Sequence, residues 1–144
     1  MSSPTIHASA VLVGARAVLI RGPSGSGKSR LALELIQAAR GGTLRFARLV
    51  GDDRVHVEAA HGRLLVRPAA ALAGMIELRG AGILQLPYEP SAVVGLVVDL
   101  AAAAAERLPA APQSRTELEG VALARLAVAA GEPALPAVLA LLTS

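Results

Sequence analysis

The sequence feature that most constrains the fold is a glycine-rich run between an apolar segment and a helical pattern. The run fits G-x-x-x-x-G-K-[ST] at every fixed position, and its residues are Gly22, Pro23, Ser24, Gly25, Ser26, Gly27, Lys28 and Ser29. Apolar residues typical of a strand precede it, and a helical pattern follows. In that context, glycines let successive backbone N–H groups turn toward an anion at the helix N-terminus. The run therefore predicts a site for ATP or a related polyphosphate, with Lys28 on the phosphates and Ser29 on Mg²⁺.

The remaining segments predict one α/β domain over residues 1–144, with a mixed sheet around this P-loop (Walker A) nucleotide-binding motif. Apolar periodicity predicts helices at residues 28–39 and 135–142. Residues 109–114 are typical of a loop, the alanine tract at 101–107 is compatible with a helix, and residues 118–130 fit neither period clearly. Short apolar runs predict strands at 8–13, 17–21, 48–50, 55–58, 64–67, 75–78, 83–86 and 93–100.

Composition excludes several classes of protein. The chain has no cysteine, which excludes disulfides and thiolate metal sites. Its net charge of +3 is small, and Phe46 and Tyr88 are its only aromatic residues, so we expect no nucleic-acid partner. The longest apolar run, residues 92–105, contains Gly95 and Asp99 and is shorter than the roughly 20 residues that cross a bilayer. With no basic flank typical of a secretion signal either, the sequence predicts a cytoplasmic protein without a membrane partner.

Phosphoryl transfer also needs carboxylates near the metal and the nucleophile, and two strands end in acid. Asp99 follows the longer and more apolar strand, which favours it on composition. Asp52 and Asp53 offer two adjacent carboxylates, one to bind a metal or water and one to accept a proton. Two like charges side by side raise the pKa of one of the carboxyl groups, which suits a group that accepts and returns a proton. Aspartate pairs are also common in plain turns, so the residues alone leave both interpretations of the pair open.

A third cluster lies at residues 76–83, where a charged pair in apolar surroundings runs into a Gly-x-Gly bend. On an extended chain, Glu77 and Arg79 would share one face, because alternate side chains of a strand point the same way. The alternative to a functional role is an ion pair on an exposed strand face.

These clusters, in this order, resemble the catalytic domain of the HPr kinase/phosphorylase family. The family has a histidine ahead of the glycine loop, an L-V-x-D-D-x-V segment and an E-[IL]-R-G-x-G-I signature. Here they stand as His7, Leu49–Val55 and Glu77–Ile83, and the resemblance covers most of residues 7–110. In that family a Mg-nucleotide phosphorylates a serine of HPr, the small phosphocarrier of the sugar phosphotransferase system, and many members also remove the phosphate by phosphorolysis.

The resemblance implies roles for individual residues. It places Lys28 on the phosphates, Ser29 and Glu77 at Mg²⁺, and one aspartate of the Asp52–Asp53 pair as acceptor of the serine proton. His7 matches a further active-site position, Arg79 belongs to the signature, and Arg107 matches a later catalytic arginine. Asp99 has no matching role, and His56 and His61 have no match and are expected at the surface.

The sequence also departs from the family pattern. The family's separate N-terminal regulatory domain is not seen, Ala8 follows His7 where glycine is usual, and the stretch from Gln37 to Leu49 is longer. Glu132 stands where a basic loop associated with dephosphorylation would have an arginine, so we expect a serine kinase of HPr and leave its phosphorylase activity open. Small-molecule kinase and non-catalytic nucleotide sensor remain the alternative functions. By family analogy the resemblance also implies a homo-oligomer, a hexamer.

Overall fold

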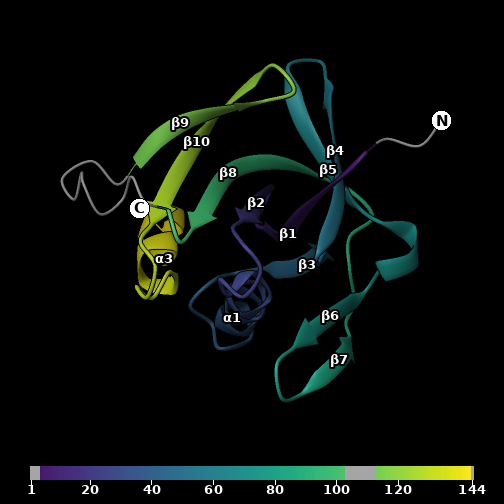
Figure 1. Ribbon diagram of the computed structural model, residues 1–144, viewed down its shortest axis with the longest axis vertical. Coiled ribbons are helices and arrows are strands. Elements are labelled where there is room, and N and C mark those ends of the chain that lie inside the picture. Colours follow the sequence, from purple (N-terminus) through teal and green to yellow (C-terminus); the bar gives the residue numbers. More distant parts are fainter. Residues whose placement is uncertain (1–3, 103–112, 144) are drawn as a thin grey trace.

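The computed structural model describes residues 4–102 and 113–143 (Figure 1). One main sheet, a small hairpin and two helices make up this part of the chain. In chain order the elements are β1 (Thr5–Val13), β2 (Arg16–Arg21), α1 (Lys28–Arg40), β3 (Ala47–Gly51), β4 (Arg54–Ala60), β5 (Arg63–Pro68), the 3-10 turn η1 (Ala70–Leu72), β6 (Met75–Leu78), β7 (Gly82–Gln85), β8 (Ala92–Leu100), β9 (Gln113–Leu118), β10 (Val121–Val128) and α3 (Leu135–Thr143).

The main sheet is mixed, as predicted, and it curls back on itself. Its order is β2-β1-β4-β5-β8-β10-β9, with β3 also paired to β1. Because β2 pairs with β8 as well, the strands β2, β1, β4, β5 and β8 close a ring. The β2–β8 and β8–β10 pairs are parallel and the other pairs are antiparallel. The parallel pairs bring the ends of β2, β8 and β10 to one edge, beside the glycine loop.

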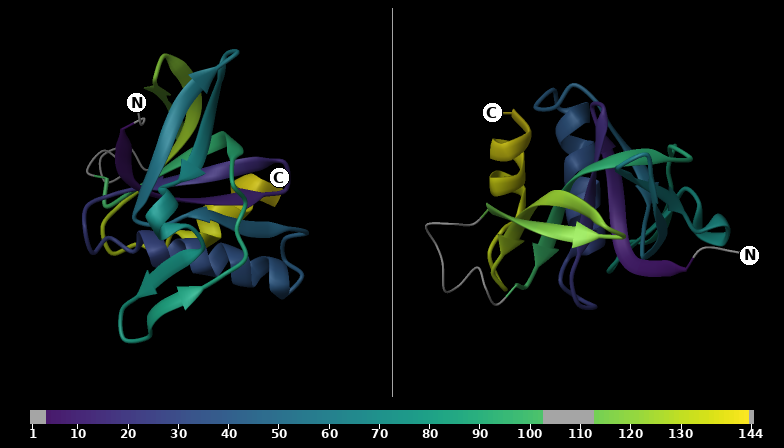
Figure 2. Two further views of the ribbon diagram at one scale, coloured as in Figure 1. Left: turned by 90° about the vertical axis from the view of Figure 1, so that its right-hand side faces the viewer. Right: turned by 90° about the horizontal axis from the view of Figure 1, so that it is seen from above.

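Two apolar cores lie on opposite faces of this sheet, because side chains alternate between its faces along each strand. One core packs the sheet against α1 and α3, which lie side by side in Figure 2 and contribute Leu31, Leu35 and Val138. The other core fills the ring with small and β-branched side chains, among them Ala8, Val55 and Val97. Every strand of the ring contributes to this second core.

The helix predicted at residues 28–39 is confirmed as α1. Its buried side chains are Leu31, Ala32, Leu35 and Ile36, which recur at the spacing of one helical face. Gly27 precedes the helix in the left-handed conformation, with φ of 98°, which favours glycine. Gly41 ends the helix, and its N–H donates to the Gln37 carbonyl at 2.9 Å.

The C-terminal part contains more strand than the sequence predicted. Residues 113 and 114, expected in a loop, begin β9, and the ambiguous stretch 118–130 contains β10. Apolar residues fill almost every position of β10, so neither period stands out in its sequence, and pairing with β8 and β9 decides for a strand. Ala101 lies in a turn with φ of 56°, which is not helical, and residues 103–107 of the alanine tract lie outside the described residues. No helix in the described ranges is long and apolar enough to cross a membrane.

Candidate functional site

The loop Pro23–Gly27, called the glycine loop below, connects β2 to α1 at the edge of the sheet. A Cβ added at Gly22, the residue before it, would lie 2.5 Å from Ser26 Oγ and 3.2 Å from the Leu100 carbonyl, so only glycine fits there without movement. Lys28 Nζ donates to the carbonyl oxygens of Gly22 at 2.8 Å and Pro23 at 3.2 Å. The ammonium group therefore lies across the loop, next to the position that a bound anion would take.

Asp52 is a buried carboxylate, with 3% of the residue exposed, and it is held by three donors. Ser9 Oγ donates to its Oδ1 at 2.6 Å, and the backbone N–H of Glu77 donates to its Oδ2 at 3.2 Å. Ser29 Oγ lies 2.7 and 2.9 Å from the two oxygens. The lone pairs of the Ser29 oxygen thus stay available for a cation. Hydrogen bonds to the ionised form compensate for the burial of a charge.

Strand pairing explains how Ser9 reaches Asp52. β3 and β4 both lie antiparallel to β1, with Ala10 opposite Gly51 and His7 opposite Arg54. Both pairs fit one continuous antiparallel register, in which Ser9 lies level with Asp52. Sequence reasoning missed Ser9, although a lone polar residue in the apolar run 8–13 was a usable signal.

Asp53, the neighbouring residue, is exposed and lies at the mouth of the site. Its φ of 68° breaks the strand between β3 and β4, so that consecutive aspartates point to different surroundings. The Asp53 carboxylate lies 3.9 Å from Nδ1 of His7. On the other side of that ring, Arg54 Nη2 lies 2.9 Å from His7 Nε2. Arg54 was not predicted, because it occupies a position that the family motif leaves open.

A pocket of about 660 Å³ joins Asp53 to the glycine loop. Lys28 and Ser29 line it from the start of α1, and Glu77 and Arg79 line it from the hairpin of β6 and β7. Asp52 and His7 adjoin this group through Ser29 and Asp53. The structure thus gathers the residues predicted for the site, except Arg107, which lies outside the described residues.

The hairpin of β6 and β7 forms a separate two-stranded sheet that projects from the main sheet beside α1 (Figures 1 and 2). Glu77 lies in β6 and is exposed. Arg79 was expected to lie on the same extended strand, but it lies in the turn that follows β6. The alternative of a Glu77–Arg79 ion pair is not seen among the described residues. Instead, Arg79 Nη2 lies 3.6 Å from the position of a Cβ at Gly25, so the guanidinium faces the glycine loop.

Asp99 does not line this pocket and instead pairs with two arginines. Arg21 donates to both of its oxygens, at 2.7 and 2.8 Å, and Arg125 Nε donates to Oδ2. Burial alone would raise the pKa of Asp99, but the hydrogen bonds and charges of Arg21 and Arg125 outweigh it and lower that pKa below 3.8. The three side chains tie together the ends of the parallel strands β2, β8 and β10. Sequence reasoning gave no sign of Arg125, which only the strand order brings to Asp99.

The histidines outside the site differ from each other. His61 is exposed, as expected. His56 was expected at the surface too, but it is half-buried, and its Nδ1 is buried without a hydrogen-bond partner in the described structure. Its position in β4, between β1 and β5, accounts for this burial.

Oxygen atoms near Ser29 suit a hard cation. The candidates are the hydroxyl of Ser29 and the carboxylates of Asp52 and Glu77, and oxygen ligands are those that Mg²⁺ prefers. Within residues 4–102 and 113–143, no group of three or more His, Cys, Asp or Glu residues gathers to hold a metal. Mg²⁺ commonly binds through one or two carboxylates together with water and substrate phosphates, so the donor set fits a nucleotide-bound Mg²⁺.

The fold and the site together define a class of protein: an α/β domain in which a glycine loop lies beside two carboxylates, those of Asp52 and Asp53. Residues 1–128 match the family described as HPr Serine kinase C-terminal domain. The match covers most of the chain, and this protein belongs to that family.

Individual relatives agree with this assignment. The HPr kinase/phosphorylase of Clostridium tetani is 37% identical over 102 residues, which are 66% of this chain and 31% of the relative. That of Streptococcus thermophilus is 42% identical over 92 residues, 62% of this chain and 28% of the relative. The chain therefore spans less than a third of the length of these curated relatives. The solved HPr(Ser) kinase/phosphatase of Coxiella burnetii shares the fold, with a TM-score of 0.78 and 23% identity over 98% of this chain and 89% of that one.

Proposed function

We propose that this domain transfers the terminal phosphoryl group of ATP to a serine hydroxyl of an HPr-like phosphocarrier in the cytoplasm. The observation that carries the proposal is the single pocket lined by Lys28, Ser29, Asp53, Glu77 and Arg79. Phosphate-binding groups and an exposed carboxylate thus face one space. Family membership supports HPr as the partner.

The glycine loop and Lys28 would bind the phosphates. Backbone N–H groups at the start of α1 and the helix dipole favour an anion there. Lys28 Nζ already lies within hydrogen-bond distance of the loop carbonyls of Gly22 and Pro23, so a small rotation would bring it to a phosphate oxygen. Its charge would stabilise the negative charge that spreads over the transferred group.

Ser29 and Glu77 would hold Mg²⁺, and Asp52 would fix Ser29. When bound with the nucleotide, Mg²⁺ neutralises phosphate charge. Because the Ser29 hydroxyl donates to Asp52, its oxygen lone pairs face away from that carboxylate. Asp52 is therefore a positioning residue in this proposal, buried and already bonded to three donors.

Asp53 would be the base that accepts the serine proton. It is exposed in the pocket, whereas the oxygens of Asp52 are occupied. In the transfer, the serine oxygen forms a bond to the terminal phosphorus, and the bond from that phosphorus to the bridging oxygen of ADP breaks. The serine proton moves to Asp53. His7, beside Asp53, would orient this carboxylate, and Arg79 and Arg107 would stabilise the transferred phosphoryl group.

We consider the reverse activity, phosphorolysis of phosphorylated HPr, separately from phosphoryl transfer to HPr. Glu132, in the connection between β10 and α3, puts a negative charge where the family pattern has arginine. An acidic residue there repels inorganic phosphate, so we propose kinase activity with little phosphorolysis of phosphorylated HPr. By analogy with the family, we also propose that the protein assembles as a hexamer, which its molar mass in solution would test.

The test is incubation of the protein with purified HPr and Mg-ATP, followed by mass spectrometry of HPr. We expect one added phosphate on a serine, and no addition with Lys28→Ala. A parallel reaction with phosphorylated HPr and inorganic phosphate tests the reverse direction. ATP binding without transfer to any HPr-like carrier would overturn the proposal in favour of a nucleotide sensor or a kinase of small molecules.

A further inference from the structure

The edge of the sheet that carries the glycine loop is held by one acidic and two basic side chains from three strands. Arg21, at the end of β2, pairs in register with Asp99 of β8, and Asp99 pairs with Ala127 of β10. Arg21 donates to both oxygens of Asp99, at 2.7 and 2.8 Å, and Arg125 of β10 donates to Oδ2. One carboxylate therefore joins three neighbouring parallel strands. Arg21, Asp99 and Arg125 are called the Asp99 cluster below.

The Asp99 cluster lies on the face of the sheet opposite α1. Ile20 and Val98, the residues before Arg21 and Asp99, belong to the core that packs against α1. Because side chains alternate between the faces of a strand, Arg21 and Asp99 lie on the other face. No member of the cluster lines the pocket of Asp53. Any effect of the cluster on a ligand in that pocket must therefore pass through the backbone.

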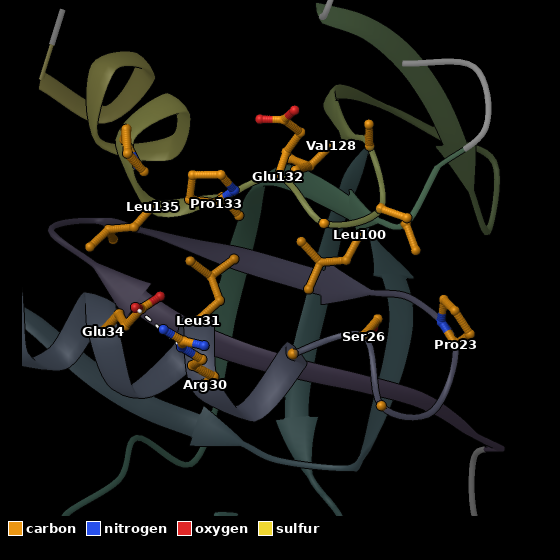
Figure 3. A pocket seen from close by; sticks show the side chains of 18 of the residues that line it. Pro23, Ser26, Arg30, Leu31, Glu34, Leu100, Val128, Glu132, Pro133 and Leu135 are labelled. Carbon is orange, nitrogen blue, oxygen red and sulfur yellow. Dashed lines mark ion pairs between the residues drawn. The ribbon is translucent and has the colours of Figure 1, made fainter. Parts of the chain in front are cut away.

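The backbone connects the cluster directly to the start of the glycine loop. Arg21 is followed by Gly22, and Asp99 is followed by Leu100. A Cβ at Gly22 would lie 3.1 Å from Leu100 Cβ and 3.2 Å from the Leu100 carbonyl oxygen, so the two strands approach closely at this point. Figure 3 shows this edge, where Leu100 and Ser26 of the glycine loop line one cavity. How β2 and β8 are held together thus sets the position of Gly22.

Gly22 in turn holds the lysine of the site. Its carbonyl oxygen accepts a hydrogen bond from Lys28 Nζ at 2.8 Å. A change in the spacing of β2 and β8 would move this carbonyl and the ammonium group with it. A guanidinium that binds both oxygens of a carboxylate fixes distance and orientation together. The contact of Arg21 with Asp99 therefore suits the task of keeping this spacing constant.

We propose that Asp99 is a positioning residue for the nucleotide, which holds the ends of β2 and β8 so that the glycine loop and Lys28 are already in place for the phosphates. The proposal rests on the proposed ATP-dependent function. A site that is ordered before binding loses less entropy when the ligand binds, so it binds more tightly. Asp53 and Glu77 are held by other elements, the turn between β3 and β4 and the hairpin of β6 and β7. Loss of the cluster should therefore affect nucleotide binding more than the transfer step.

The test measures binding and transfer separately in Asp99→Asn at pH 7. Isothermal titration calorimetry with Mg-ATP and with Mg-tripolyphosphate gives the affinities, and steady-state kinetics with HPr gives KM for ATP and kcat. We expect both ligands to bind about fivefold or more weakly and KM for ATP to rise accordingly. We expect kcat to change by less than about twofold, because the bound nucleotide itself orders the loop.

Val66→Ala is the matched control for a general loss of stability. Val66 is buried in the same core of the ring and pairs with Ala92 at the start of β8, the opposite end of that strand from Asp99. The substitution removes buried volume and should lower the stability of the fold. It should leave both affinities and KM for ATP unchanged.

A second variant keeps the test decisive if Asp99→Asn does not fold. Arg21→Lys keeps the charge but cannot bind both oxygens of Asp99, so it should weaken both ligands at a smaller loss of stability. The double variant should bind no more weakly than Asp99→Asn alone, because both substitutions break the same contact.

The outcomes separate this role from the proposed function. If the wild type binds ATP and phosphorylates HPr, the positioning role is overturned by variants that lose no more affinity than Val66→Ala. A fall in kcat with unchanged affinities would overturn it too, and in both cases the proposed function stands. If the wild type binds neither ligand, the proposed function falls and the positioning role with it.

Discussion

The hydroxyl of Ser29 lies 2.7 and 2.9 Å from the two carboxylate oxygens of Asp52, across 23 residues of sequence. This contact joins the first turn of α1 to the end of β3. Ser9 and the backbone of Glu77 bind the same carboxylate, so four segments meet at one buried charge. The two adjacent aspartates consequently have different surroundings, and they should respond differently to the same substitution.

Asp52→Asn should lower the free energy of unfolding by about 1–3 kcal/mol, because an amide nitrogen would face donors in a buried site. Asp53→Asn should change it by less than about 0.5 kcal/mol, because Asp53 is exposed and asparagine tolerates its left-handed conformation. Urea unfolding measures the free energies of both variants.

The rate of phosphoryl transfer should nevertheless fall about 10²- to 10⁴-fold in Asp53→Asn, through loss of the base. An undiminished rate in this variant would refute the assignment of Asp53.

Gly22→Ala should weaken the binding of ATP and of tripolyphosphate alike. The new Cβ would lie 2.5 Å from Ser26 Oγ and 3.1 Å from Leu100 Cβ, so the glycine loop must shift, at a cost of about 1–3 kcal/mol. Gly41→Ala is the matched control, because its Cβ would lie at ordinary contact distance from the carbonyls of Gln37 (3.5 Å) and Ala38 (4.0 Å), and its φ is −84°. Calorimetry with both ligands measures the effect. Equal affinities in the two variants would show that the close approach at Gly22 does not matter.

The sequence predicted the parts of the site that depend on local order. The glycine loop and α1 were readable because strand, turn and helix follow one another directly. The roles of Asp52 and Asp53 were not separable, because burial of one and exposure of the other depend on how β3 and β4 pair with β1. Ser9 and Arg125 reach their carboxylates only through strand register. A lone polar residue in an apolar run marked Ser9 as unusual, but the sequence did not show which carboxylate either residue would reach, because that depends on the register.

The contact between Arg54 and His7 predicts which ring nitrogen of His7 carries the proton. Arginine can only donate, so Nε2 of His7, 2.9 Å from Arg54 Nη2, must accept, and the proton lies on Nδ1, which faces Asp53. Two-bond ¹⁵N–¹H correlation spectra should show this tautomer in the neutral wild-type ring. Arg54→Leu should return His7 to a mixture with more proton on Nε2. If the wild-type ring is already protonated on Nε2, the contact does not hold in solution.

The Asp99 cluster predicts a dependence of stability on pH. Because the pKa of Asp99 is lowered in the folded protein by Arg21 and Arg125, despite partial burial, the folded state binds a proton less readily than the unfolded state. The stabilisation is therefore complete above the unfolded pKa of about 3.8 and is lost as the pH falls through the lower folded value. Asp99→Asn should be less stable than wild type by about 2 kcal/mol at pH 7, and the gap should narrow below pH 3.8. Glu117→Gln, on the edge strand β9 and exposed, should show no comparable gap at pH 7. Urea unfolding from pH 7 down to pH 2.5 measures the difference, and a gap that stays constant over this range would contradict the lowered pKa.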